Sequence, residues 1–274
     1  MGESKAMSEV RELFDLQGKV AIVTGGAGRL GSQMSDALAE AGAHVVIAGR
    51  NASRCQEKST QLSAKYNEAL AFAMDVTIPT SVQAMTDAVE TRFGRIDVLV
   101  NAAYSGEHST FEEMTMQGFE SAIRGGLTST FLCCQAVSRV MKTAGQGVIV
   151  NVGSIYGIVS PDQRIYGEVG NNSPCNYGAA KAGVIQFTRF LATYLAPHHI
   201  RVNCLTPGGF YNDAAAEQDP SYKEVFAHNF SDRTPLARMG NKTDLKGAIV
   251  FLASNASDYM TGHNLVVDGG WTAW

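Results

Sequence analysis

Strand-like and helix-like patterns alternate along almost the whole chain, and this alternation limits the fold more than any other feature. Short apolar runs that are typical of strands occur at 20–24, 44–48, 69–74, 96–100, 147–152, 200–205 and 265–267. Helical patterns lie between them, and the one at 32–41 ends before Gly42, where glycine favours a helix C-terminus. Strands separated by helices form parallel βαβ units. The sequence therefore predicts a doubly wound α/β fold with one parallel sheet in a single domain.

Charge and composition narrow the possible partners. The formal net charge is −4 at pH 7, which gives no reason to expect nucleic acid or an anionic membrane surface as a partner. No apolar run reaches about 18 residues, and the N-terminus lacks a signal-peptide pattern. The cysteines form no Cys-x-x-Cys pair and the histidines show no ligand spacing. We therefore expect a cytoplasmic protein without a catalytic metal.

A glycine-rich turn, Thr24-Gly-Gly-Ala-Gly-Arg-Leu-Gly31, joins the first predicted strand to the first helix. Glycines permit a tight turn and the close approach of a phosphate, and the helix N-terminus supplies free N–H groups. The turn therefore predicts Rossmann-like binding of a dinucleotide, with contacts from Gly25, Gly28, Arg29, Leu30 and Gly31. The Arg29 side chain either approaches a ribose 2′-phosphate or points to solvent.

The end of the second strand bears on which dinucleotide fits. A carboxylate there would accept hydrogen bonds from the ribose 2′-hydroxyl of NAD. Gly49 holds this position instead, and Arg50 and Asn51 follow. Because an arginine suits a 2′-phosphate, the sequence favours NADP over NAD, with Arg50 and Asn51 as contacts. A solvated loop charge is the alternative for Arg50.

Tyr177 and Lys181 begin another helical pattern, four residues apart. On a helix these two positions share a face. A phenol has a pKa near ~10 and is a poor base at neutral pH, but a cation held close lowers that pKa. The pair predicts an acid–base tyrosine assisted by a lysine. The spacing alone leaves a plain surface pair open.

Together these motifs resemble the short-chain dehydrogenase/reductase family, in its shorter single-domain branch. The resemblance runs from about Leu16 to the C-terminus. Ser154 resembles the serine that hydrogen-bonds the substrate oxygen. The family's cofactor-binding elements are matched by Asp75-Val76 beside the adenine, Asn101-Ala102-Ala103 in an Asn-Asn-Ala-Gly element, and Pro207-Gly208 beside the nicotinamide.

The resemblance implies a mechanism and an assembly. Ser154 holds a carbonyl or alcohol oxygen, Tyr177 transfers its proton, and hydride moves to or from the nicotinamide. Lys181 lowers the pKa of Tyr177 and binds the nicotinamide ribose. Similarity to gluconate-type dehydrogenases implies a small polar substrate, such as a sugar acid or a polyol. The family also implies a homotetramer, with the segment 271–274 at an interface.

The chain departs from the family's pattern at several site positions. Arg29 replaces the middle glycine of the turn, and Tyr104 replaces the glycine of the Asn-Asn-Ala-Gly element. Gly126 replaces a helix asparagine whose main-chain carbonyl supports a proton-relay water. Because Gly126 keeps a carbonyl and Gly125-Gly126 can bend a helix, we expect the relay to survive. Phe210 and Asn212 replace an aliphatic and a hydroxyl residue, and both remain expected cofactor contacts.

Three segments stand apart from the repeating pattern: an N-terminal extension (1–15), an inserted loop (158–175) and a helix-prone stretch (209–235) that resembles a mobile substrate lid. The insertion is polar and rich in turn residues. It either contacts the substrate through Arg164, Asp162 or Glu168, or it forms a solvated hairpin or a subunit contact.

Two other functions remain open from the sequence. Reduction of a 3-oxoacyl thioester would require a basic surface for a carrier protein, and Arg233 and Arg238 are too few to form one. A dinucleotide-binding sensor without turnover would be consistent with Gly126 and Ala102, but the intact Ser154, Tyr177 and Lys181 argue against it.

Overall fold

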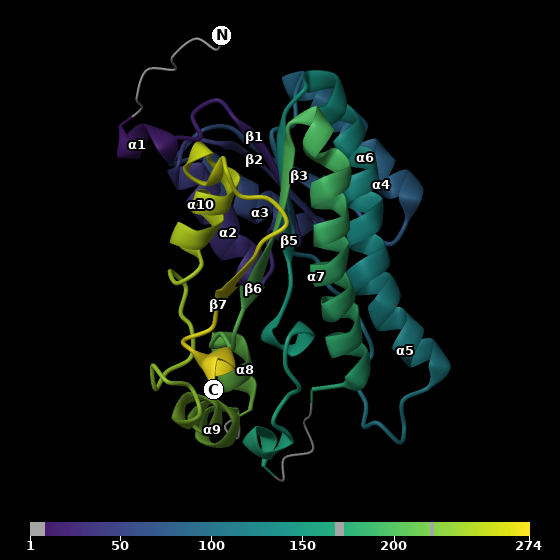
Figure 1. Cartoon of the computed structure of the whole chain (residues 1–274), viewed down its shortest axis with the longest axis vertical. Helices are drawn as coiled ribbons and strands as arrows, with labels where there is room; N and C mark the ends of the chain where they lie inside the picture. The colour runs from purple at the N-terminus through teal and green to yellow at the C-terminus, as the bar shows by residue number, and fades with distance from the viewer. Residues whose placement is uncertain (1–8, 168–172, 220–221) are drawn as a thin grey trace.

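Seven parallel strands form one sheet at the centre of the computed structural model, in the order β3-β2-β1-β4-β5-β6-β7 (Figure 1). The structure describes residues 9–167, 173–219 and 222–274. The strands are β1 (Val20–Thr24), β2 (His44–Gly49), β3 (Ala69–Ala73), β4 (Val98–Asn101), β5 (Gly147–Val152), β6 (Ile200–Pro207) and β7 (Asn264–Val267). The predicted doubly wound, Rossmann-like single domain is confirmed.

Helices cover both faces of the sheet, as Figure 1 shows. One face carries α2 (Arg29–Glu40), α3 (Ala52–Ser63) and α10 (Lys246–Ala253), and the other carries α4 (Pro79–Phe93), α6 (Ser129–Ala144) and α7 (Cys175–Leu195). The short α5 (Met116–Ala122) runs into α6 through a π-helical segment, Ile123–Thr128. In β1, Ala21 and Val23 pack into the core beneath α2, while Val20 and Ile22 pack into the opposite core. Burial on both sides explains why the strands read as continuous apolar runs.

Several element boundaries differ from the sequence prediction, and two starting positions differ by two residues or more. The helix predicted at 32–41 begins at Arg29, because the turn closes within the glycines and Gly28 is already the N-cap. The strand predicted at 96–100 begins at Val98, and the preceding Asp97 is hydrogen-bonded to Val20 through both its backbone N–H and its carboxylate. Of the predicted extension, α1 (Val10–Leu13) is helical and residues 1–8 lie outside the described residues.

The chain reverses its winding direction between β1 and β4. These strands are neighbours in the sheet, but β1 connects onward to β2 and β4 onward to β5. The loops leaving their carboxyl ends therefore separate and open a crevice, which is where doubly wound sheets bind ligands. The glycine turn leaves β1 at this point.

The predicted insertion and lid lie together beyond the carboxyl ends of β5 and β6, at the lower end of Figure 1. The insertion contains a 3-10 turn, Gln163–Tyr166, and its residues 168–172 lie outside the described residues. The lid contains α8 (Asp213–Gln218), a π-helical turn (Tyr222–Ala227) and α9 (His228–Asp232). A separate small core, here called the lid core, joins them through Ile155, Ile165, Ala227, Phe230, Met239 and Trp271. None of the helices in the described part of the chain is long and apolar enough to span a membrane.

Candidate active site

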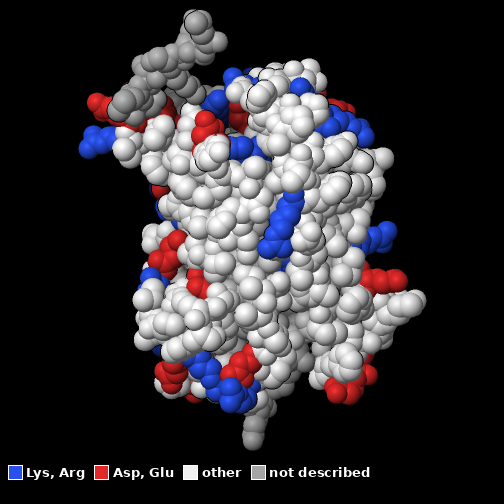
Figure 2. Space-filling model, in the orientation of Figure 1, with Lys and Arg blue, Asp and Glu red and all other residues white. Residues whose placement is uncertain are grey.

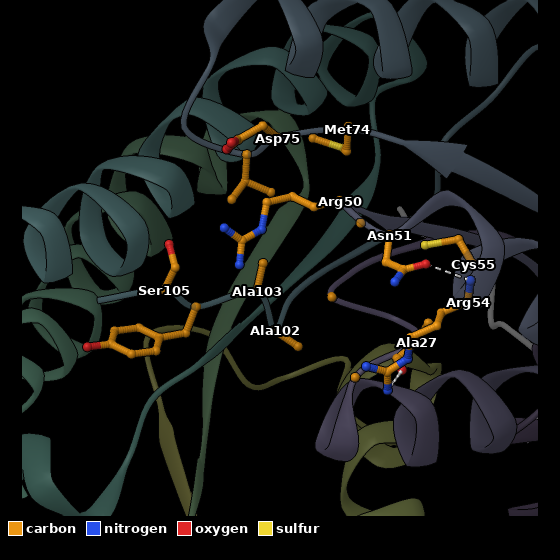
Figure 3. A pocket seen from close by; sticks show the side chains of 15 residues that line it. Ala27, Arg50, Asn51, Arg54, Cys55, Met74, Asp75, Ala102, Ala103 and Ser105 are labelled. Carbon is orange, nitrogen blue, oxygen red and sulfur yellow. Dashed lines mark hydrogen bonds between the residues drawn. The ribbon is translucent and has the colours of Figure 1, made fainter. Parts of the chain in front are cut away.

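A cavity of about 310 Å³ opens at the carboxyl ends of β1, β2 and β4 (Figure 3). It brings together eight of the predicted cofactor contacts: Gly25, Gly28, Arg50, Asn51, Asp75, Val76, Ala102 and Ala103. Its remaining lining residues were not predicted as contacts, and they are Ala27, Gly49, Arg54, Cys55, Met74, Tyr104 and Ser105. The structure thus confirms the location of the predicted crevice.

The glycine turn forms one wall of this cavity. Gly25 has a φ of 67°, which favours glycine, and a Cβ on Gly31 would lie 2.1 Å from the Gly25 carbonyl oxygen. Gly28 caps α2 without a side-chain hydrogen bond, so the first N–H groups of the helix are available to a phosphate. Leu30 lies in the same first turn.

Two arginines lie at the other end of the cavity. Figure 3 shows the Arg50 side chain extending over the cavity toward Ala103, with Arg54 beside Ala27. Arg54 donates a hydrogen bond to the Ala27 carbonyl at 3.0 Å, and Asn51 caps α3 by accepting the Arg54 backbone N–H at 3.0 Å. Sequence reasoning missed Arg54. Its place in the first turn of the helix after β2 is the signal that would have found it, since that turn faces the same crevice as the strand end.

The predicted adenine-side pair and the asparagine after β4 differ in what their side chains do. Asp75 accepts hydrogen bonds from the backbone and hydroxyl of Thr77, and these bonds, together with the charge of Arg50, lower its pKa despite some burial. Asn101 turns into the sheet and donates to Asn151 at 2.9 Å. Its side chain is therefore used within the sheet, and the predicted cofactor contact at Asn101 stays a prediction.

Ser154 and Tyr177 meet just beyond the end of β5. Ser154 is 6 % exposed; its Oγ accepts the backbone N–H of Tyr156 at 3.2 Å, and its hydroxyl hydrogen-bonds to Tyr177. Burial raises the pKa of Tyr177 and outweighs the hydrogen bond from Ser154 and the charge of Arg29, both of which lower it. Tyr177 therefore keeps its proton at neutral pH in this structure.

Lys181 shares the inner face of α7 with Tyr177, as the spacing predicted. Its Nζ donates to the Val152 carbonyl at 2.7 Å and lies 5.9 Å from the centre of the Tyr177 ring. Burial lowers the pKa of Lys181 to about 8. Burial outweighs the groups that lower the pKa of Tyr177, among which the cation is Arg29, and the predicted lowering of this pKa by Lys181 stays a prediction.

Gly126 lies in the π-helical segment between α5 and α6, so the predicted bend is confirmed. Its carbonyl accepts the Thr130 hydroxyl at 2.7 Å and the Ser129 hydroxyl at 3.2 Å. The carbonyl is thus already hydrogen-bonded within its own helix, which argues against the predicted relay water at this atom.

The predicted contacts around the Pro207-Gly208 turn lie away from the cavity wall. Phe210 is buried in the main core, and its carbonyl accepts a hydrogen bond from the Arg29 guanidinium at 3.2 Å. Asn212 caps α8 by accepting the Ala215 N–H at 3.4 Å. Arg29 therefore ties the glycine turn to the start of the lid, and the Phe210 and Asn212 side chains serve the protein itself.

The insertion packs on the lid, which argues against a solvated hairpin, one of the readings that the sequence left open. Ile165 is fully buried, its carbonyl accepts from the Asn229 amide at 3.2 Å, and Tyr166 stacks on Phe226 at 5.1 Å. Because of this packing, the insertion is not a solvated hairpin.

The charged residues of the insertion are also used within the chain. Asp162 pairs with Arg164 at 2.8 Å and with Arg233 of the lid at 3.3 Å. Neither Asp162 nor Arg164 is therefore free for a substrate, and Glu168 lies outside the described residues.

The residues present fit a nicotinamide dinucleotide. The turn at Gly31 admits no side chain, free N–H groups begin α2, and two guanidinium groups lie at the cavity. Ser154, Tyr177 and Lys181 form an acid–base group at the end of the neighbouring strand. Fold and site together define an oxidoreductase that uses a nicotinamide dinucleotide.

Comparison with known proteins names the family. A family model described as enoyl-(acyl carrier protein) reductase matches residues 26–272. D-threitol dehydrogenase of Mycolicibacterium smegmatis is 34% identical over 97% of this chain and 99% of its own, and a 3-oxoacyl-[acyl-carrier-protein] reductase (FabG) of Vibrio cholerae is 34% identical over 94% and 98%. The crystal structure of a gluconate 5-dehydrogenase from Burkholderia cenocepacia, in complex with NADP and tartrate, has a TM-score of 0.85 and 30% identity, covering 97% of this chain and 100% of that one. The chain belongs to the short-chain dehydrogenase/reductase family.

Proposed function

We propose that the protein is an NADP-dependent oxidoreductase that interconverts a ketone and a polar secondary alcohol, with a sugar acid or a polyol as substrate. The observation that carries this proposal is the meeting of Ser154, Tyr177 and Lys181 beside a cavity that holds two arginines and an uncapped helix N-terminus.

Arg50 supports the choice of NADP. Gly49 offers no carboxylate at the end of β2, and the Arg50 and Arg54 guanidinium groups suit the dianion of a 2′-phosphate. The gluconate 5-dehydrogenase similar to this chain was solved with NADP. The nearby Asp75 carboxylate interacts with Arg50 and favours its orientation toward the cavity.

Each residue of the acid–base group has one task. When bound, the nicotinamide supplies or accepts the hydride. Ser154 donates its hydroxyl proton to the substrate oxygen and holds it near the phenol. Tyr177, whose raised pKa keeps it protonated, donates its proton to the developing alkoxide during reduction. Oxidation requires the phenolate, which forms once Tyr177 has released its proton to solvent and which then accepts the proton of the alcohol. Lys181 places a cation 5.9 Å from the Tyr177 ring, where it stabilises the phenolate that remains.

The choice of substrate rests on similarity and on charge. Relatives named for threitol and for gluconate act on polyols or sugar acids by their names. The second candidate is a 3-oxoacyl thioester reductase, which the description of the family model and the relative from Vibrio cholerae favour. On the face shown in Figure 2, basic and acidic side chains are interspersed over the lid, so no continuous basic surface faces a carrier protein or a nucleic acid there.

The remaining assignments are proposals of the same kind. The segment 209–235 acts as the substrate lid, the insertion 158–175 supports it, and residues 1–15 are an extension without a catalytic role. We place the protein in the cytoplasm, because its cysteines form no disulfide pattern.

The predicted assembly is a homotetramer by family resemblance, with the segment 271–274 at an interface. Trp271 is buried within its own chain, whereas Trp274 is 80% exposed and available to such an interface. Aromatic side chains on the outer faces of α6 and α7 remain exposed, namely Phe131, Phe190 and Tyr194, and they support association through these helices.

A substrate panel tests the proposed function. Keto sugar acids, ketoses, polyols and a 3-oxoacyl thioester are assayed by the absorbance of reduced nicotinamide, with NADPH and NADH in parallel. We expect turnover with a sugar acid or polyol partner, a loss of at least ~100-fold in kcat for Tyr177→Phe without a change in NADPH affinity, and a selective rise in the KM for NADPH in Arg50→Ala. Turnover of the thioester alone would establish the second candidate. Tight NADPH binding without any turnover would instead support the sensor.

A further inference from the structure

Two departures from the family's pattern meet in space. Tyr104 stands where the Asn-Asn-Ala-Gly element ends in glycine, and Gly126 stands where the family has a helix asparagine. A Cβ added to Gly126 would lie 3.2 Å from Cδ2 and 3.3 Å from Cε2 of Tyr104. These distances are tighter than ordinary van der Waals contacts. The Tyr104 ring thus occupies the space into which an asparagine side chain at 126 would extend.

The same ring contacts the acid–base group. Tyr104 and Tyr177 form an edge-to-face pair, with centroids 5.0 Å apart and an interplanar angle of 85°. The Lys181 ammonium lies 5.5 Å from the centre of the Tyr104 ring and 5.9 Å from that of Tyr177. Both distances are within the range of cation–π attraction. Tyr104 therefore limits the positions open to the phenol and to the ammonium at once.

The contribution of Tyr104 comes from its ring and not from its hydroxyl. The hydroxyl is buried and has no hydrogen-bond partner among the described residues. A Cβ on Gly106 would lie 2.5 Å from this oxygen, so the oxygen points toward Gly106. Burial, and then the charge of Tyr177, raise the pKa of Tyr104 to about 12. Tyr104 thus remains neutral at neutral pH.

We propose that Tyr104 is a positioning residue for Tyr177 and Lys181, and that Gly126 provides the space that admits its ring. The two departures are then one compensated exchange, in which an aromatic ring takes the place of an asparagine side chain. The proposal rests on the proposed function only for the roles of Tyr177 and Lys181.

Kinetics against pH test the positioning role. Tyr104→Ala removes the ring, so the phenol and the ammonium lose a fixed neighbour and water gains access to both. We expect kcat to fall ~10-fold to ~100-fold with a smaller change in the substrate KM. We also expect the Tyr177 limb of the pH profile to move to lower pH, because water stabilises the phenolate. Tyr104→Phe keeps the ring and loses only a hydroxyl without a hydrogen-bond partner. Its kcat should therefore stay within about threefold of that of the original protein.

A double-mutant cycle tests the exchange. Gly126→Asn alone forces a side chain into the Tyr104 ring and should lower both kcat and the melting temperature. Tyr104→Gly in the same chain removes the contact with the ring, leaves the contact with the Ala180 Cβ at 3.2 Å, and restores the family's combination. The double variant should therefore lose less kcat and less thermal stability than the sum of the two single losses. Additive effects in both measurements would contradict the proposal.

A measurement without substrate separates this proposal from the proposed function. The ultraviolet absorbance of tyrosinate is titrated in the original protein, in Tyr104→Ala and in Tyr177→Phe, whose difference spectrum assigns Tyr177. Tyr259→Ala is the control, because Tyr259 is fully exposed. The titration of Tyr177 should move to lower pH in Tyr104→Ala and not in Tyr259→Ala. If no substrate turns over, this shift and the melting temperatures of the double-mutant cycle still test the proposal. An unmoved Tyr177 titration would overturn it.

Discussion

At the scale of single residues, the glycine turn is most tightly closed at Gly31. A Cβ on Gly31 would lie 2.1 Å from the Gly25 carbonyl oxygen, a backbone atom that cannot easily move away. We predict that Gly31→Ala opens the turn, lowers the free energy of unfolding by about 2 kcal/mol or more, and abolishes NADPH binding. Fluorescence titration of NADPH and urea unfolding measure the two effects.

Gly247 provides the matched control. It lies within α10, and a Cβ there would meet nothing within 4 Å. Gly247→Ala should leave NADPH binding intact and stabilise the protein by about 0.5 to 1 kcal/mol, because alanine loses less entropy in a helix. Equal behaviour of the two variants would contradict the turn geometry.

The lowered pKa of Lys181 predicts that the stability of the protein depends on pH. Its pKa is about 8 in the folded protein against the ordinary 10.5, so between these values the unfolded chain binds more protons. The free energy of unfolding therefore rises with pH across this window. At pH 7, Lys181→Met should be more stable than the original protein by up to about 3 kcal/mol, reduced by about 1 kcal/mol for the lost bond to Val152.

This advantage should shrink as the pH rises from 8 to 10.5, which urea unfolding at a series of pH values measures. Lys65 is exposed, so Lys65→Met is the control for the loss of a lysine charge. If the difference in the free energy of unfolding between Lys181→Met and the original protein stayed constant from pH 8 to 10.5, burial would not lower the pKa of Lys181. Activity of Lys181→Met should be lost at every pH.

Local sequence patterns predicted which residues meet at the site, but not their electrostatics. Helical spacing placed Tyr177 and Lys181 on one face because that depends only on the period of the helix. The net pKa shift of Tyr177 depends on burial by segments far away in the chain, and no local pattern contains that information. Likewise, the sequence showed only that Tyr104 departs from the family's pattern. Its contact with Gly126 joins two residues that are distant in the sequence, so it could not be predicted from a local pattern.

At the scale of elements, the insertion and the lid depend on each other. Ile165 is fully buried in the lid core, whereas Ile158, at the start of the same insertion, is 45% exposed. Ile165→Ala should destabilise the lid core by about 2 to 5 kcal/mol and increase amide hydrogen exchange in α9. It should raise the substrate KM more than it lowers kcat, because the lid closes less completely. Ile158→Ala should change neither the amide hydrogen exchange of α9 nor the substrate KM.

The insertion also shows where sequence reasoning stops. Its polar and turn-rich composition correctly predicted a segment without long helices or strands. One buried isoleucine and an ion pair to Arg233 decide where it packs, and such sparse contacts leave no periodic signal. The hydrogen bond of the Asp97 carboxylate to the Val20 backbone is another contact that hydrophobicity does not encode.

At the scale of the whole molecule, the sheet was the most predictable feature. Strands buried on both faces are continuous apolar runs, and right-handed parallel crossovers leave few ways to order them. The observed strand order is consistent with these two constraints. The association of whole chains is not constrained in this way, because the pattern of surface residues along the sequence does not identify the surface that they contact.

The aromatic side chains on α6 and α7 make association testable. Phe190 and Tyr194 are each 58% exposed and stack on each other at 5.8 Å. We predict that the protein is an oligomer in sedimentation velocity, and that Phe190→Asp with Tyr194→Asp shifts it to smaller species. Tyr259→Asp, at another exposed aromatic residue, should leave the distribution unchanged. A monomer at every concentration would reject association through this face.

The stacking of Trp271 on Phe230, with centroids 4.2 Å apart and planes inclined by 14°, gives the protein an internal optical reporter. The chain has two tryptophans, and Trp274 is 80% exposed. Quenching by acrylamide therefore removes the emission of Trp274 first and leaves that of Trp271. Because Phe230 belongs to the lid, the remaining emission follows the lid's position without any attached dye. A tag fused to the C-terminus would sit three residues from this reporter, so such experiments call for a tag at the other end.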